Sequence, residues 1–151
     1  MRFLGNIEAK ADQKGRVFLP ATFRKELQRE GQETMVLRKD AFQQCLVLYP
    51  ESVWNEQLTL MRKKLNRWDA VQQNVFRTFI SEAEQVTLDG NGRFLISRRS
   101  LDFAGITSEV RFIGMDDTIE IWASKKTEQP FMEMEDFGAQ LTALMKTEDG
   151  I

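Results

Sequence analysis

The chain of 151 residues has 42% hydrophobic and 29% charged residues, the composition of a soluble globular protein and not of a disordered tail. It has no histidine and one cysteine, Cys45, which excludes an internal disulfide, a cysteine-cluster zinc site and the usual serine-hydrolase triad. The net charge of −2 and the pI of about 5.3 argue, taken alone, against a nucleic-acid partner.

The charge is unevenly distributed along the chain. Residues 1–30 carry seven basic against four acidic residues, a net of +3, whereas residues 127–151 carry one lysine against six acidic residues, a net of −5. A local basic face is therefore compatible with the acidic total. No run approaches the ~18 apolar residues of a membrane span, and the sequence turns polar directly after residue 4. We expect a cytoplasmic protein without a membrane partner.

Apolar spacing, turn residues and prolines predict a mixed set of elements in the first half. In chain order they are an extended segment at 3–10, a turn at 12–15, a strand at 16–19, a helix at 22–29, strands at 35–37 and 45–49, and helices at 54–65 and 69–83. Cys45 falls in a β-rich run and is interpreted as a core residue. The stripe of Trp54, Leu58, Met61 and Leu65 is interpreted as core packing.

The same order of elements restarts in the second half. Its predicted elements are strands at 85–88 and 93–96 around a turn, a short helix at 97–105, strands at 110–113 and 119–122, and a helix at 128–145. Each half is too small to bury a good core alone, so we expect the two to pair. We assign residues 1–76 to a first repeat with a helical extension and residues 77–151 to a second with a C-terminal helix, together forming one pseudo-twofold domain.

A short motif, Asp-x-x-Gly-Arg, occurs in both halves, 77 residues apart (89 minus 12). An aspartate that opens a turn accepts a hydrogen bond from the backbone two residues on, and the glycine adopts a positive φ without steric cost. The arginine then emerges at the start of the next strand, where the aspartate holds its guanidinium. The turn supports are Asp12, Gly15, Asp89 and Gly92.

An oriented guanidinium suits a phosphate or the O6/N7 edge of guanine, and a lysine adds a point charge for the DNA backbone. The candidate DNA-binding residues are therefore Lys14, Arg16 and Arg93. A purely structural interpretation stays open, in which the salt bridge only keeps each turn in register. The repetition does not decide between the two, because a duplicated fold also duplicates its structural turns.

Three segments resemble the signatures of the MraZ family of bacterial regulators, encoded at the head of the division and cell-wall gene cluster. They are Asp12-x-Lys-Gly-Arg-Val-Phe-Leu-Pro-x-x-Phe-Arg24, Phe76-Arg-Thr-Phe-x-x-x-Ala-Glu-x-Val-x-Leu-Asp-x-x-Gly-Arg93 and Ile113-Gly-Met-Asp-Asp-Thr-Ile-Glu-Ile-Trp122. The resemblance implies an α+β fold, an internally duplicated swapped-hairpin β-barrel of the AbrB/SpoVT type with flanking helices. It also implies a homo-oligomeric ring, associated with the nucleoid, that binds double-stranded DNA at short direct repeats in its own promoter and regulates transcription.

The chain departs from the family pattern in the second motif. The second turn has no lysine, and Ser97 stands where the first copy has Pro20. The contribution of the second turn to DNA binding is therefore left open. The alternative function is a protein-interaction module without a DNA role, antitoxin-like or scaffolding. An enzyme is not expected, since no histidine and no clustered carboxylate pair support one; no cofactor or metal is expected either.

Overall fold

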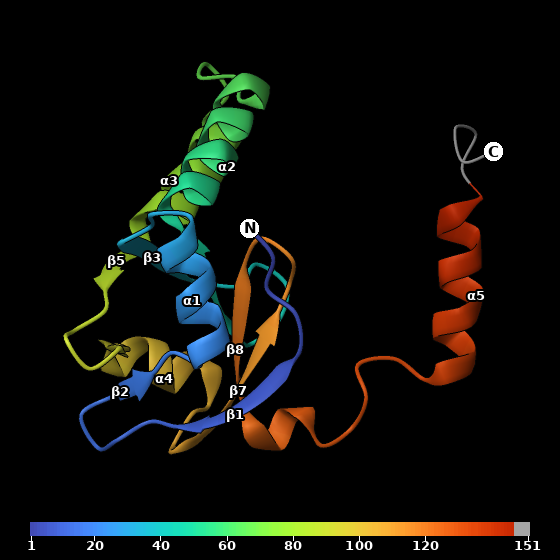
Figure 1. Ribbon diagram of the computed structural model, residues 1–151. Helices are drawn as coiled ribbons and strands as arrows, with labels where there is room; N and C mark the ends of the chain where they lie inside the picture. The colour runs from blue at the N-terminus through green and yellow to red at the C-terminus, as the bar shows by residue number, and fades with distance from the viewer. Residues whose placement is uncertain (147–151) are drawn as a thin grey trace.

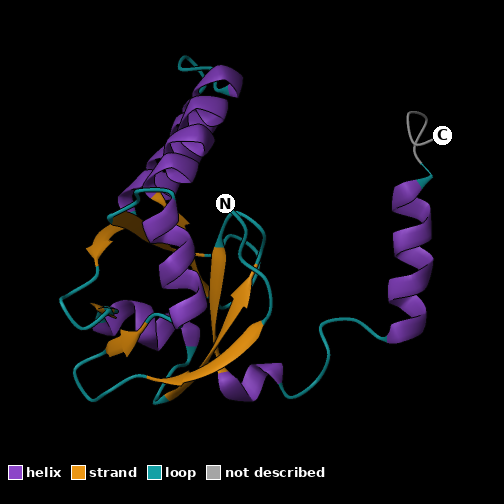
Figure 2. Cartoon of the chain, viewed as in Figure 1, coloured by secondary structure: helices purple, strands orange, loops and turns teal. Residues whose placement is uncertain are grey.

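The computed structural model describes residues 1–146 as a mixed α+β protein (Figures 1 and 2). The elements in chain order are β1 (Asn6–Lys10), β2 (Arg16–Phe18), α1 (Ala21–Arg29), β3 (Thr34–Lys39), β4 (Leu46–Pro50), α2 (Glu51–Lys64), α3 (Ala70–Ser81), β5 (Glu84–Thr87), β6 (Arg93–Leu95), α4 (Arg98–Ala104), β7 (Glu109–Gly114), β8 (Ile119–Ala123), the 3₁₀ helix η1 (Ser124–Thr127) and α5 (Met134–Met145).

Strands from the two halves of the chain pair with each other. Six strands form one antiparallel sheet in the order β1-β7-β8-β4-β3-β5, and β2 pairs with β6 in a separate two-stranded ribbon. Four of the pairings join the halves: β1 with β7, β2 with β6, β3 with β5 and β4 with β8. These four strand pairs join the first half of the chain to the second, as predicted.

The described strands do not form the closed barrel that the family resemblance implies. The six-stranded sheet has two open edges, β1 and β5. The β2–β6 ribbon joins it only through an isolated bridge between Ala11 and Val17. Each ribbon strand has only three residues, and within residues 1–146 neither continues the ladder of the six-stranded sheet. The α+β class is confirmed, and the closed barrel is wrong for residues 1–146.

The hydrophobic core lies between the sheet, the ribbon, α1 and α4. α1 contributes Phe23 and Leu27, four residues apart on one helix face, and Phe23 packs edge-on against Phe3 with ring centroids 5.4 Å apart. The two ribbon strands contribute Val17 and Phe94, which are almost fully buried. The prediction that Cys45 is a core residue is confirmed, since its side chain is completely buried. The burial of Val17 and Phe94 therefore determines which face of the ribbon points into the core.

α2 and α3 form a helical hairpin that projects beyond the sheet (Figure 1). Trp54 of α2 stacks on Phe79 of α3 with ring centroids 5.0 Å apart, and the buried Arg38 of β3 donates from Nε to the Phe79 carbonyl at 2.9 Å. Of the stripe predicted to pack in the core, only Trp54 is buried; Leu58, Met61 and Leu65 are half-exposed. Leu58, Met61 and Leu65 lie on the part of the hairpin that projects beyond the sheet, so they have no sheet to pack against.

The predicted helix at 128–145 begins later than expected. The chain forms η1 up to Thr127 and resumes helical structure only at Met134. Pro130 explains the gap, because a proline disfavours helical backbone at the residue before it, here Gln129. Phe131, predicted to lie on the helix, instead lies before it and packs on Trp122, with ring centroids 5.1 Å apart. Glu148 and Asp149 of the acidic tail lie outside the described residues.

α5 stands apart from the rest of the protein (Figures 1 and 2). Every residue of the helix is exposed, including five large apolar side chains. No helix within residues 1–146 has the length and apolar character needed to cross a membrane.

Candidate nucleic-acid interface

The first Asp-x-x-Gly-Arg turn is closed by the carboxylate of Asp12. Its Oδ1 accepts from the backbone N–H groups of Lys14 and Arg16, each at 2.9 Å, and its Oδ2 accepts from Nε of Arg16 at 2.8 Å. The backbone N–H of Gly15 donates to the Asp12 carbonyl at 3.0 Å. One carboxylate therefore orders both the turn and the arginine that follows it.

The second turn has the same hydrogen bonds. Oδ1 of Asp89 accepts from the backbone N–H groups of Asn91 and Arg93, each at 2.9 Å, and Oδ2 accepts from Nε of Arg93 at 3.0 Å. The N–H of Gly92 donates to the Asp89 carbonyl at 3.0 Å. The loss of the lysine leaves the geometry of this turn unchanged, because Asn91 supplies the same backbone N–H.

Each turn is also tied to the strand that follows the other turn. The N–H of Leu19 donates to the carbonyl of Gly92 at 3.0 Å, and the N–H of Ile96 donates to the carbonyl of Gly15 at 2.8 Å. Gly15 and Gly92 have φ of +90° and +83°, a region that residues with a Cβ rarely adopt. The ribbon and the two turns are therefore one hydrogen-bonded unit built from both halves.

The pairing register places both arginines on the outer face of the β2–β6 ribbon. Arg16 lies opposite Leu95, and Phe18 lies opposite Arg93. Because side chains alternate along a strand, these four point to one side while Val17 and Phe94 point into the core. Phe18 and Leu95 are more than half exposed, and the Arg93 guanidinium lies 5.8 Å from the Phe18 ring centroid. The structure thus brings Arg16 and Arg93 together, roughly 7 Å apart along the ribbon.

In each arginine, the described hydrogen bonds use only Nε, toward its own aspartate. Within residues 1–146, the Nη groups of Arg16 and Arg93 donate to no protein atom. A planar guanidinium with free N–H donors is the group that binds a phosphate or a guanine edge. Here Nε is used to orient each arginine, which leaves its Nη groups as the donors available to a ligand. Lys14 is exposed at the tip of the first turn.

Arg24 is a cation beside the second turn that the candidate set missed. A Cβ on Gly92 would lie 2.9 Å from Cδ of Arg24, and Arg24 also donates to the carbonyl of Leu19. At the first turn, the corresponding neighbour of Gly15 is Leu101, which lies 77 residues beyond Arg24. The sequence shows that Arg24 and Leu101 occupy equivalent positions, 77 residues apart. It does not show that Arg24 contacts Gly92, because this contact depends on the pairing of β2 with β6, which no local pattern reveals.

The first turn has its own cationic neighbours, at the start of α4. Ser97 accepts from the N–H of Ser100 and so begins this helix, the role that Pro20 has before α1. Arg98 and Arg99 follow it and are exposed. The substitution of Ser97 for proline therefore preserves the start of the helix.

Comparison with protein families matches residues 2–75 and 79–146 to the family described as "MraZ protein, putative antitoxin-like". The chain belongs to the MraZ family. It is 59% identical over 151 residues to the "Transcriptional regulator MraZ" of Phocaeicola vulgatus, covering 100% of this chain and 98% of the relative. The proteins of the same name in Bacteroides fragilis and Bacteroides thetaiotaomicron are 57% identical over 98% of the chain and 56% identical over 99%, and the chain covers 94% and 96% of them.

In this member of the MraZ family, the turn aspartates are held in their charged form. The pKa of Asp12 and of Asp89 lies below the ordinary value of 3.8, chiefly because the backbone N–H of Arg16 or Arg93 donates to the carboxylate, with the arginine side chain contributing less. A lowered folded-state pKa contributes stability that is present above the unfolded pKa and is lost as pH falls through the folded value. Protonation of the two carboxylates in acid is therefore expected to weaken both turns.

We expect the Arg16→Ala variant to keep most of the lowered Asp12 pKa. Alanine retains the backbone N–H at position 16, the largest cause of the shift, and removes only the side-chain contact. NMR titration of the side-chain carboxyl carbons measures both aspartates, and Asp89 in the same sample is the internal control. A return of the Asp12 pKa to its ordinary value in this variant would show that the arginine side chain, and not the backbone, orders the turn.

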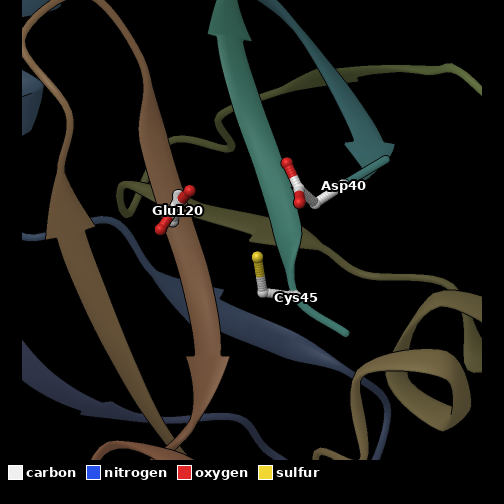
Figure 3. A group of neighbouring side chains, drawn as sticks. All are labelled: Asp40, Cys45 and Glu120. Carbon is white, nitrogen blue, oxygen red and sulfur yellow. The ribbon is translucent and has the colours of Figure 1, made fainter. Parts of the chain in front are cut away.

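A second cluster of titratable groups lies at the start of β4 (Figure 3). Asp40, Cys45 and Glu120 approach one another within 4.8 Å, although the sequence contains no conventional metal-binding motif. Burial raises the pKa of the Cys45 thiol to about 12 and raises the pKa of Glu120. Glu120 accepts from Nε1 of Trp122 at 2.9 Å, and Asp40 accepts from the N–H groups of Phe42 and Gln43. These hydrogen bonds give both carboxylates structural roles.

Proposed function

We propose that this protein is a sequence-specific DNA-binding transcriptional regulator that acts on the division and cell-wall gene cluster. The observation that carries the proposal is the outer face of the β2–β6 ribbon, where Arg16 and Arg93 point the same way and are each held by an aspartate. A two-stranded ribbon fits the major groove of B-DNA, where an oriented arginine recognises guanine. The relatives' name, transcriptional regulator, supports the same conclusion.

The proposed DNA contacts are Lys14, Arg16 and Arg93, with Asp12, Gly15, Asp89 and Gly92 as their supports. Arg24 adds a cation beside the second turn. Arg98 is exposed two residues after Ile96, whose N–H donates to the carbonyl of Gly15 in the first turn. The acidic total charge does not oppose this arrangement, because the acidic residues around α5 stand well away from the ribbon (Figure 1). The ribbon keeps a local positive field in a chain of net charge −2.

We further propose that residues 1–76 and 77–151 are two repeats of one pseudo-twofold domain whose hairpins are swapped, as in AbrB-like proteins. Support comes from the equal hydrogen bonding of the two turns and from the strand pairs that join the halves. A single chain offers few cations, so the proposal includes a ring oligomer that repeats the ribbon and reads short direct repeats of promoter DNA at the nucleoid.

The test is a mobility shift with double-stranded DNA from upstream of the protein's own gene. We expect binding to the fragment with direct repeats to fall steeply between about 50 and 200 mM salt, because neutralised phosphates release counterions. The matched control is a fragment of the same composition with the repeats scrambled, which should bind far more weakly. Equal binding of both fragments would refute sequence-specific recognition, and no shift at any salt concentration would favour the protein-interaction module.

A further inference from the structure

α5 carries an apolar stripe that no other part of residues 1–146 covers. Met134, Phe137, Leu141 and Leu144 recur at spacings of three, four and three residues, and so lie on one face of the helix. Their exposed fractions are 86%, 55%, 43% and 67%. An exposed helix of 12 residues is marginal in water by itself, so this helix needs a partner surface.

The helical hairpin of α2 and α3 also has an exposed apolar surface. No residue of α3 is buried, although the helix carries several large apolar side chains. A groove of about 450 Å³ runs along the hairpin and is predominantly apolar. We call it the α2–α3 groove; it is lined by Leu65, Arg67, Gln73, Phe76, Arg77, Ile80 and Ser81.

Charge distinguishes this groove from another on the same hairpin. The α2–α3 groove contains Arg67 and Arg77 and no acidic residue. Three acidic residues stand at the start of α5: Glu133, directly before the helix and beside the apolar stripe, and Glu135 and Asp136, on the opposite face of the first turn. The other groove is lined by two basic residues, Arg38 and Lys39, and two acidic residues, Asp40 and Glu82, so its lining has no net charge to attract these side chains. Opposite charges around complementary apolar surfaces favour docking in the α2–α3 groove.

α5 does not reach the groove of its own chain. The packing of Phe131 on Trp122 holds the linker against β8, and α5 begins three residues later. Three residues span at most about 10 Å. In Figure 1 the hairpin projects above the strands and α5 stands to their right, well apart from the hairpin. The occupant of the groove must therefore come from another molecule.

We propose that α5 of one chain docks in the α2–α3 groove of a second copy of this chain. Each copy donates one helix and receives one, so the contact is heterologous and propagates from chain to chain until it closes into a ring. This inference deepens the proposed function, since it names the surface through which the proposed assembly forms. A failure of this docking proposal is distinguishable from a failure of the proposed DNA-binding function, because assembly is measured without DNA.

The first test is the mass of the purified protein by light scattering. We expect wild type to be an oligomer and Phe137→Asp/Leu141→Asp to be a monomer of 17.6 kDa, because two carboxylates on the stripe oppose burial. The matched control is Ala139→Asp/Ala143→Asp, which adds the same charges to the opposite face of α5 and should remain oligomeric. α5 contributes nothing to the core, so circular dichroism should show both variants folded.

The second test combines two defective chains. Arg67→Glu/Arg77→Glu spoils the groove but leaves α5 intact, whereas Phe137→Asp/Leu141→Asp does the reverse. Each alone should be monomeric, and a mixture should form a heterodimer of twice 17.6 kDa that grows no further. A monomeric wild type, an oligomeric stripe variant, an oligomeric groove variant or a mixture that stays monomeric would each overturn the proposal.

Discussion

We expect the Arg16→Ala/Arg93→Ala double variant to lose at least about 30-fold in affinity for the direct-repeat DNA fragment. An oriented arginine on a guanine edge contributes about 1–3 kcal/mol of discrimination, and every 1.4 kcal/mol is a factor of ten. Both guanidiniums are already held by aspartates, so little ordering cost opposes their binding. Fluorescence anisotropy titrations of wild type and variant at one salt concentration measure the difference.

Two controls separate the arginine contacts from the loss of charge. Arg62→Ala removes an equally positive, exposed side chain from α2, remote from the ribbon, and should leave affinity nearly unchanged. Arg16→Lys keeps the charge but loses the planar donor pair, so it should keep the salt dependence and reduce the preference for the repeat fragment. If the double variant bound the fragment as tightly as wild type, the ribbon would not be the DNA interface.

We expect Arg16 and Arg93 to contribute more equally to DNA affinity than the sequences of their turns suggest. The first turn has Lys14 and the second has no lysine, which predicts a weaker second contact. The structure places Arg24 against Gly92, so the second turn also has a neighbouring cation. The single variants Arg16→Ala and Arg93→Ala, measured in the same titration, quantify this balance.

We expect Gly15→Ala to destabilise the protein by about 3 kcal/mol and Gly92→Ala by about half as much. Both positions have strongly positive φ, which costs a residue with a Cβ about 1–3 kcal/mol. A Cβ on Gly15 would lie 2.4 Å from the backbone carbonyl oxygen of Ile96, which the ribbon hydrogen bonds hold in place. A Cβ on Gly92 would meet only the side chain of Arg24, which is able to move.

Urea unfolding measures these differences, and Gly90→Ala is the control within the second turn. Gly90 has an ordinary φ and no atom within 4 Å of its Cβ position, so the free energy of unfolding should change little. Because Gly92→Ala displaces Arg24, it should also weaken DNA binding beyond its effect on stability. Equal destabilisation by Gly15→Ala and Gly92→Ala would contradict the asymmetry between a fixed carbonyl and a mobile side chain.

Elements with strong local signals were predicted from the sequence. The ribbon strands, α1, α4 and the strand pair β7–β8 appear near their expected positions, since proline, glycine and apolar spacing mark their ends. The helix expected from residue 128 begins only at Met134, because apolar spacing was followed across Pro130, which disfavours helical backbone at the residue before it. The closed barrel failed for a different reason, because sheet closure depends on edge pairing between distant strands.

The sequence by itself determined the two turns. The hydrogen bonds that close each turn join residues at most four apart, so Asp, Gly and Arg at the right spacing specify this local geometry. Only the tertiary structure decided that Arg16 and Arg93 share one face, that Arg24 lies beside Gly92, and that α5 stands apart. Each of these depends on pairing or linker contacts between segments distant in the chain, which compete with many alternatives and are selected by burial of the common core.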